Sequence, residues 1–258
     1  MDLVNSIVKA VRILDLLKKS GSLSYAEILK QFPLPKSTLF KILSTLEAEE
    51  LVRRDQESSR YQLGVRLIEW GSGARSQLEI RQIARPFMKK LSDSLECTVH
   101  LTVMTHGEVL PIESFESGSS YWHNFSFPGG IGIPAPLHAT GAGKAILAFL
   151  DRAEIDARIG KWELERFTDR TITDPDDLRA DLGRIRDRGY ATTDGEHDEM
   201  VRSVAAPIRD HSGQVIASLS ALALASRFAL ERFPEIGRAV VAAADEISRL
   251  FGYLPGEA

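Results

Sequence analysis

Apolar and polar positions in the first fifty residues follow a helical period. The spacing of one buried helix face, i, i+3, i+4 and i+7, is occupied by Leu39, Ile42, Leu43 and Leu46. Pro35 suits the first position of this helix, because the N–H group that proline lacks would have no partner there. The opposite side carries Ser37, Lys41, Ser44, Thr45 and Ala48. The pattern therefore predicts an amphipathic helix whose outer face is small, hydroxylic and basic.

Two shorter helices are predicted before this one. The first is marked by Ile7, Ala10, Val11, Leu14 and Leu17. It ends at Gly21, because glycine is favourable just after a helix. Ser24 and Glu27 have the spacing of a capping box that begins the second helix, and Pro33 prevents that helix from continuing past about Phe32. Three helices separated by tight turns form a helix-turn-helix.

A short hairpin is predicted after the third helix, with strands at Leu51–Arg54 and Tyr61–Leu63 around a polar connector. A hairpin in this position is the wing of a winged helix-turn-helix. The outer helix face and the wing can approach phosphates and base edges. We therefore predict DNA contacts from Lys36, Ser37, Thr38, Phe40, Lys41, Ser44, Thr45, Arg53, Arg54 and Arg60. The open alternatives are a solvated surface helix and a hairpin that only adds solubility.

The rest of the chain alternates helices with strands. Helical periodicity from Val65 to about Leu95 is interrupted at Gly71–Gly73, which predicts a connecting helix, a flexible joint and the first helix of a second domain. Strands are predicted at 99–103, 109–112, 203–208 and 215–222, and helices at 140–150, 153–159, 176–188 and 230–251. Hairpin-linked strands among helices predict an α+β domain with an antiparallel sheet flanked by helices. The predicted domains are residues 1–65, a linker helix at 66–78, and residues 79–256.

The composition is that of a soluble globular protein, with 43% apolar and 26% charged residues. The chain has neither an N-terminal signal pattern nor an apolar run long enough to cross a bilayer, so we expect no membrane partner. The single cysteine, Cys97, excludes an internal disulfide and fits a reducing compartment. We therefore expect a cytoplasmic protein.

Charge is distributed unevenly along the chain. Through Trp70, eleven Lys and Arg stand against nine Asp and Glu, whereas the remainder has twenty-one against twenty-seven. The first part is therefore net +2 and the rest net −6. This difference favours contact of the first part with a polyanion and disfavours it for the rest.

Enzymatic chemistry has little support in the sequence. Gly141–Lys144 is not a phosphate-binding Walker A loop, because His138 and Ala145 stand where that motif needs Gly and Ser or Thr. Cys97 has no catalytic motif around it. The pair His100 and His106 and the run Glu196-His197-Asp198-Glu199 lack the i, i+4 histidine spacing of a helical zinc site. We expect surface histidines, a solvated acidic loop, no metal, no cofactor and no enzyme.

Two segments, in the right order, resemble the IclR family of bacterial transcriptional regulators. The first is Leu34–Thr38 with Leu46-Glu47, Val52–Asp55 and Tyr61–Gly64; the second is Pro136–Ala148 with Arg188–Ala191 and Ala205–Ile208. The resemblance implies a winged helix-turn-helix followed by a GAF-like effector-binding domain. It also implies a homodimer or homotetramer on a palindromic operator in double-stranded DNA, controlled by a small organic acid or aromatic compound. We expect a repressor; an architectural DNA-binding protein whose C-terminal domain only oligomerises is the alternative.

The same resemblance implies an effector site. Its positions here are Gly141, Ala142, Thr193, Asp194, Ser203, Ser220 and Leu222. Free N–H groups at a helix start would hold a carboxylate at Gly141 and Ala142. The alternative is that these small residues only let helix and sheet pack closely.

The chain departs from the family pattern on its DNA-binding side. Glu50 stands where the family often has glycine, so this residue must adopt a positive φ or the turn is rebuilt. Pro33 replaces a glycine before the recognition helix, and Lys41 replaces an arginine. A lysine weakens the expectation of a bidentate contact to guanine.

The effector positions depart from the family pattern as well. Ser203 replaces a cysteine, Thr193 an acidic residue, Leu222 a serine and Met200 a glycine. These changes predict a less polar pocket, and hence a carboxylate larger than a two- or three-carbon acid. Aromatic walls are expected from Tyr121, Trp122, Phe125 and Phe127, unless these residues only form core.

Overall fold

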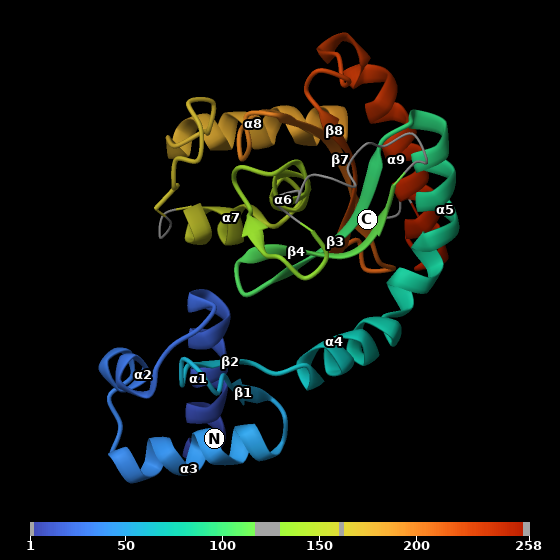
Figure 1. Ribbon diagram of the computed structural model, residues 1–258. Helices are drawn as coiled ribbons and strands as arrows, with labels where there is room; N and C mark the ends of the chain where they lie inside the picture. Colours follow the sequence, from blue (N-terminus) through green and yellow to red (C-terminus); the bar gives the residue numbers. More distant parts are fainter. Residues whose placement is uncertain (1–2, 117–129, 160–162, 255–258) are drawn as a thin grey trace. The chain divides into compact units, whose positions relative to one another are not determined.

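The computed structural model describes residues 3–116, 130–159 and 163–254. The chain forms two compact units, Met1–Leu78 and Glu79–Ala258 (Figure 1). Within the described ranges, no helix has both the length and the apolar character needed to span a membrane.

The first unit contains the predicted helix-turn-helix and hairpin. Its elements are α1 (Asn5–Ser20), α2 (Tyr25–Gln31), α3 (Lys36–Ala48), β1 (Val52–Arg54), β2 (Tyr61–Leu63) and α4 (Arg66–Ser76). The capping box is confirmed, since Ser24 Oγ accepts from the Glu27 N–H and the Glu27 carboxylate accepts from the Ser24 N–H. The predicted stripe of α3 is buried against α1 and the hairpin. The winged helix-turn-helix therefore rests on a small apolar core.

The turn after α3 has the strained backbone that the sequence predicts. Glu50 has φ 56°, and the Leu51 N–H closes the helix end on the Leu46 carbonyl at 2.9 Å. Gly64 lies directly against this turn, because a Cβ added there would stand 1.9 Å from the Glu50 carbonyl oxygen. Only glycine fits at position 64. Glu50 adopts the left-handed conformation although it lacks the conformational freedom of glycine.

The predicted joint at Gly71–Gly73 is wrong. α4 continues through these residues to Ser76, and the chain breaks at Gln77-Leu78 before α5 (Glu79–Leu95). A glycine in a helix costs only about 1 kcal/mol relative to alanine. The neighbouring residues of α4 outweigh that cost, so glycine alone does not end the helix.

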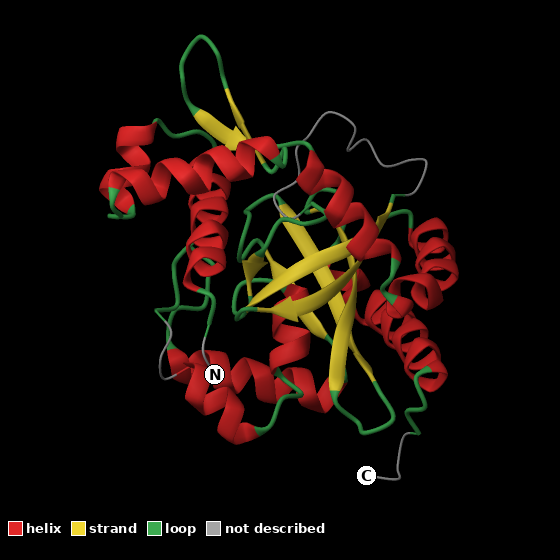
Figure 2. Cartoon of the chain, turned by 90° about the horizontal axis from the view of Figure 1, so that it is seen from below, coloured by secondary structure: helices red, strands yellow, loops and turns green. Residues whose placement is uncertain are grey.

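The second unit is built on one antiparallel sheet, whose strands are yellow in Figure 2. The strand order is β5-β4-β3-β8-β7-β6. Its strands are β3 (Thr98–Thr105), β4 (Glu108–Phe115), β5 (Ala135–Pro136), β6 (Ala191–Asp194), β7 (Val201–Arg209) and β8 (Val215–Leu224). The α+β fold is confirmed. The two shortest strands of this sheet, β5 and β6, were not predicted, because neither Ala135-Pro136 nor Ala191–Asp194 shows a clear alternation of apolar and polar residues.

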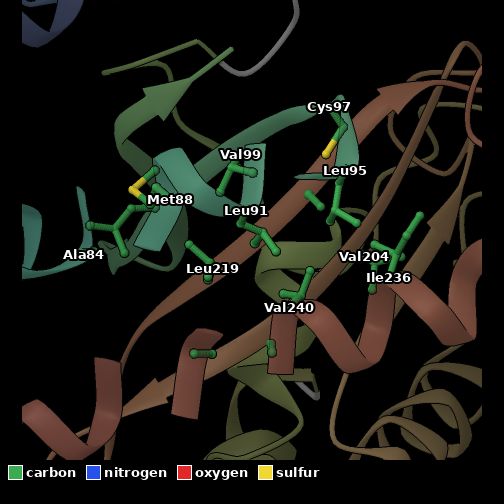
Figure 3. Packing of buried hydrophobic residues seen from close by; sticks show 14 of the residues in the cluster. Ala84, Met88, Leu91, Leu95, Cys97, Val99, Val204, Leu219, Ile236 and Val240 are labelled. Carbon is green, nitrogen blue, oxygen red and sulfur yellow. The ribbon is translucent and has the colours of Figure 1, made fainter. Parts of the chain in front are cut away.

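Helices cover both faces of the sheet. The remaining elements are α6 (Gly141–Leu147), α7 (Arg152–Ile159), α8 (Pro175–Arg188), a 3-10 turn at Leu230–Arg232, and α9 (Phe233–Leu250). α5 and α9 pack on one face, where Met88, Leu91, Val204 and Val240 share a core (Figure 3). Helices α6, α7 and α8 pack on the other face, together with Ala205 of β7. Successive residues of β7 therefore serve opposite cores.

We predict that Glu50→Gly stabilises the first unit. A left-handed conformation costs an L-residue about 1–2 kcal/mol, and glycine avoids that cost. Hydrogen–deuterium exchange of the α3 amides in the full chain should slow by about fivefold.

The matched control is Glu47→Gly, an exposed position inside α3. Glycine in a helix interior is unfavourable, so exchange should accelerate there. If both variants accelerate exchange, the turn at Glu50 is not strained.

Candidate functional site

The outer face of α3 is exposed. Lys36, Ser37, Phe40, Lys41, Ser44 and Thr45 are all exposed, and Thr38 is half-buried. Phe40 is the most unusual member, because 63% of this large aromatic residue is accessible to water. The Thr45 hydroxyl donates to the Lys41 carbonyl at 2.8 Å, which fixes its orientation. The face thus offers two lysines, three hydroxyls and one aromatic ring before its first acid, Glu47.

The predicted wing arginines have different surroundings. Arg53 donates to the Gln62 amide oxygen at 2.8 Å, and the Arg54 guanidinium lies 5.6 Å from the centre of the Tyr61 ring. Both remain exposed. Arg60 is more constrained, because it pairs with Glu27 at 2.9 Å and donates to Ser22. In this structure Arg60 braces the wing against the beginning of α2.

A cavity of about 80 Å³ lies in the second unit between α6, the sheet and the connection from β6 to β7. Six of the seven predicted effector positions line it: Gly141, Ala142, Thr193, Ser203, Ser220 and Leu222. Thr193 and Ser203 are cross-strand partners, and their hydroxyl oxygens are 2.6 Å apart. The antiparallel pairing of β6, β7 and β8 therefore brings together residues that are distant in the sequence.

Asp194, the seventh predicted position, does not line the cavity. Its carboxylate pairs with Arg170 and with Arg202, each at 2.5 Å. Arg202 also donates to the carbonyls of Ala225 and Phe228. Because side chains alternate along β6, Asp194 points away from its neighbour Thr193 and holds the sheet edge together.

Other lining residues were missed by the sequence analysis. They include His100 and Thr102 of β3, Val109 and Pro111 of β4, and His197 and Asp198 of the connection after β6. A signal for the first two existed, since they alternate with Val99, Leu101 and Val103 in a strand that is otherwise apolar. The predicted aromatic walls, Tyr121, Trp122, Phe125 and Phe127, lie outside the described residues.

The glycine-rich start of α6 packs closely against its surroundings. A Cβ at Gly143 would stand 2.3 Å from the Leu137 carbonyl oxygen, so close packing requires glycine there. A Cβ at Gly141 would stand 2.4 Å from Ser203 Oγ, at the cavity wall. Thr140 caps the helix by accepting from the Gly143 N–H. Only the first residues of the helix therefore remain at the cavity.

Lys144 is buried between two carboxylates. Its Nζ lies 2.9 Å from Asp181 of α8 and 2.7 Å from Glu196 of the β6–β7 connection. Burial alone would raise the pKa of Asp181, but Lys144 and Arg184 outweigh it and lower that pKa. Burial raises the pKa of Glu196. The expectation of a solvated acidic loop is wrong for Glu196, and this buried triad fixes the loop that presents His197 and Asp198.

Burial shifts the pKa of both histidines in the cavity wall. Burial lowers the pKa of His100 to about 4, and chiefly burial lowers the pKa of His197. Cys97, outside the cavity wall, has its pKa raised to about 12 by burial, so it is not a reactive thiolate. Across the described ranges, no group of three or more His, Cys, Asp or Glu side chains is placed to hold a metal ion.

Sequence comparison matches both units to family models. The model "Bacterial transcriptional regulator IclR C-terminal" matches residues 73–249, and the model "IclR helix-turn-helix domain" matches residues 6–56. The HTH-type transcriptional regulator XynR of Escherichia coli is 32% identical over 254 residues, which cover 98% of this chain and 99% of that protein.

Solved structures agree with the sequence matches. The crystal structure of the Thermotoga maritima IclR is 33% identical, with a TM-score of 0.71 over 97% of this chain and 100% of that chain. An IclR homolog from Microbacterium hydrocarbonoxydans, complexed with 4-hydroxybenzoate, is 26% identical, with a TM-score of 0.75 over 95% and 99% of the two chains.

We predict that Lys144→Met destabilises the second unit by about 3–5 kcal/mol, because it leaves the buried Glu196 carboxylate without a cation and Asp181 with only the more exposed Arg184. Urea denaturation of the full chain, followed by circular dichroism, measures the loss. The control adds Asp181→Asn and Glu196→Gln to the same variant, which removes the unpaired charges and should recover part of the stability. A Lys144→Met chain as stable as the original would show that the triad contributes nothing.

Proposed function

Because the chain belongs to the IclR family of bacterial transcriptional regulators, we propose that its first unit binds an operator and that a small carboxylate in its second unit controls this binding. The chain is a DNA-binding transcriptional regulator of the helix-turn-helix type. The family consists of regulators rather than enzymes, so the activity to explain is regulated binding. The proposal places the protein in the cytoplasm, with duplex DNA as partner and no membrane.

The exposed face of α3 carries the DNA-binding part of the proposal. Lys36 and Lys41 supply positive charge, and Ser37, Thr38, Ser44 and Thr45 supply short hydrogen-bonding groups. A helix with such a face fits the major groove, and Arg53 and Arg54 of the wing reach neighbouring phosphates. Arg60 contributes only if it leaves Glu27. Phe40 is proposed to contact a thymine methyl group, because it is aromatic and exposed.

A second copy of the chain is proposed to complete the DNA-binding form. Leu3, Ile7 and Val11 lie at i, i+4 and i+8, and each is more than half exposed. This apolar stripe on and just before α1 supports a contact between two first units. A dimer, or a dimer of dimers, would then present two α3 helices to successive major grooves of a palindrome. We propose that α4 acts as the linker between DNA-binding and effector-binding parts.

The cavity supports the effector part of the proposal. Its walls are largely apolar, with Val109, Pro111, Ala135, Ala139 and Leu222, and a cluster of hydroxyl groups stands at one side. This combination suits a carboxylate with an apolar body, larger than a two- or three-carbon acid. The relative bound to 4-hydroxybenzoate is consistent with that class. We propose that the protein represses transcription and that the acid shifts it toward conformations that fit the operator poorly.

The test of this part is a thermal-shift series with glyoxylate, pyruvate, benzoate and 4-hydroxybenzoate. A ligand that binds the native state must raise the unfolding temperature. We expect the larger acids to stabilise the chain, and Ser203→Ala to weaken their binding about fivefold by removing one hydrogen bond. Ser94→Ala, on α5 and outside the cavity wall, should leave binding unchanged. Stabilisation by the two smallest acids alone would contradict the size class.

An absence of stabilisation by every acid would favour the alternative function. The chain would then be an architectural DNA-binding protein whose second unit only oligomerises. That outcome would leave the proposed DNA-binding surface intact, because α3 and the wing belong to the first unit.

We predict that Lys41→Ala weakens operator binding and lowers the slope of log K against log salt by about one. Each lost phosphate contact releases one fewer counterion. Fluorescence anisotropy at several salt concentrations measures the slope. The control is Lys90→Ala, an exposed lysine of the second unit, which should leave the slope unchanged. An unaltered slope in Lys41→Ala would remove this residue from the phosphate contacts.

A further inference from the structure

His100 is one of the residues that line the cavity. It lies on β3 and is only 8% exposed. Its cross-strand neighbours are Ser114 on β4 and Ser220 on β8. Because His100 belongs to the cavity wall, a ligand held there can contact its imidazole.

The described cavity wall offers no permanent positive charge. None of its residues is lysine or arginine, and its charged or titratable members are His100, His197 and Asp198. Among the described residues, the positions near His100 on β3, β4, β7 and β8 include Thr102, Ser114, Ser203, Ser220 and Leu222. Lys144, the fourth residue of α6, is buried, but its ammonium group is already paired with Asp181 and Glu196.

A carboxylate in this cavity therefore needs a counter-charge from elsewhere. Hydroxyl groups donate hydrogen bonds but carry no charge. α6 has only seven residues, and Thr140 already accepts from the Gly143 N–H. Burying an anion without a partner is strongly unfavourable, and Asp198 adds repulsion. A proton taken up from solvent by a group in the cavity wall would provide this positive charge.

We propose that a carboxylate effector binds together with one proton, which His100 takes up from solvent to form an imidazolium–carboxylate pair. The neutral imidazole gains the proton, the effector stays ionised, and no bond to carbon forms or breaks. This inference rests on the proposed function, since it concerns the same cavity and the same ligand class. His100 would act as the positioning residue for the carboxylate.

The pH dependence has a definite sign. In the ligand-free protein the pKa of His100 is about 4, because of burial. A nearby carboxylate raises that pKa, because it stabilises the charged form. Between the two values, binding consumes a proton, so the affinity rises about tenfold for each unit by which the pH falls. Above the raised pKa the dependence disappears.

The experiment is isothermal titration calorimetry of the full chain with benzoate at about pH 5.5 to 7.5, where benzoate remains ionised. Two buffers with different enthalpies of ionisation give the number of protons taken up. We expect about one proton at the acidic end in the original chain and none in His100→Gln. The matched control is His106→Gln, an exposed histidine at the β3–β4 turn outside the cavity wall, which should keep the uptake. His197→Gln asks separately whether the other wall histidine takes up the proton.

Each other outcome has a definite meaning. Benzoate binding without proton uptake in the original chain would overturn the inference, whatever the variants do. Uptake lost in His197→Gln but kept in His100→Gln would also overturn it, and so would equal pH dependence for the neutral analogue benzamide. If benzoate, 4-hydroxybenzoate, pyruvate and glyoxylate all fail to bind at every pH, the carboxylate class of the proposed function fails, and the inference with it.

Discussion

The sheet of the second unit is covered by helices on both faces, and this constraint decides where polar side chains can stand. A buried strand tolerates a hydroxyl or an imidazole only where a partner or a cavity accepts it. The side chains of β3, β7 and β8 that point toward α6 include His100, Ser203 and Ser220, and they meet at the cavity. Those pointing the opposite way are mostly apolar, and Val99, Leu101, Val204 and Leu219 among them belong to the core formed with α5 and α9. The candidate ligand site is therefore a place where polar side chains of the buried sheet meet.

A bulge in the sheet places two residues of β4 that are two positions apart on opposite faces. The pairing of β3 with β4 shifts between Leu101 and Thr102, so Glu113 pairs with Leu101 while Pro111 pairs with Thr102. Pro111 lines the cavity, and Glu113 lies on the α5 face, where it forms ion pairs with Arg81 and Arg85. A regular pairing would have left both side chains on one face. The bulge keeps this carboxylate out of a cavity that already contains Asp198.

Close backbone approach is the second recurrent constraint. Gly64 lets the hairpin return against the Glu50 carbonyl, Gly143 lets α6 lie on Leu137, and a Cβ at Gly237 would stand 2.6 Å from the Tyr190 ring. In each case the missing side chain is what allows two elements to touch. These glycines have no functional side chain, but the close packing that they allow fixes the positions of the neighbouring elements.

Local patterns alone determined the helix-turn-helix, the capping box at Ser24, the end of α1 at Gly21 and the α+β class, because each depends on residues within a few positions of one another. Family resemblance added most of the cavity positions. Only the tertiary structure decided that Arg60 braces the wing, that Asp194 turns away from the cavity, and that Glu196 is buried against Lys144. The sequence does not distinguish a charged side chain in water from one that pairs with a residue far away in the chain. The packing of the whole unit determines which residue becomes its partner.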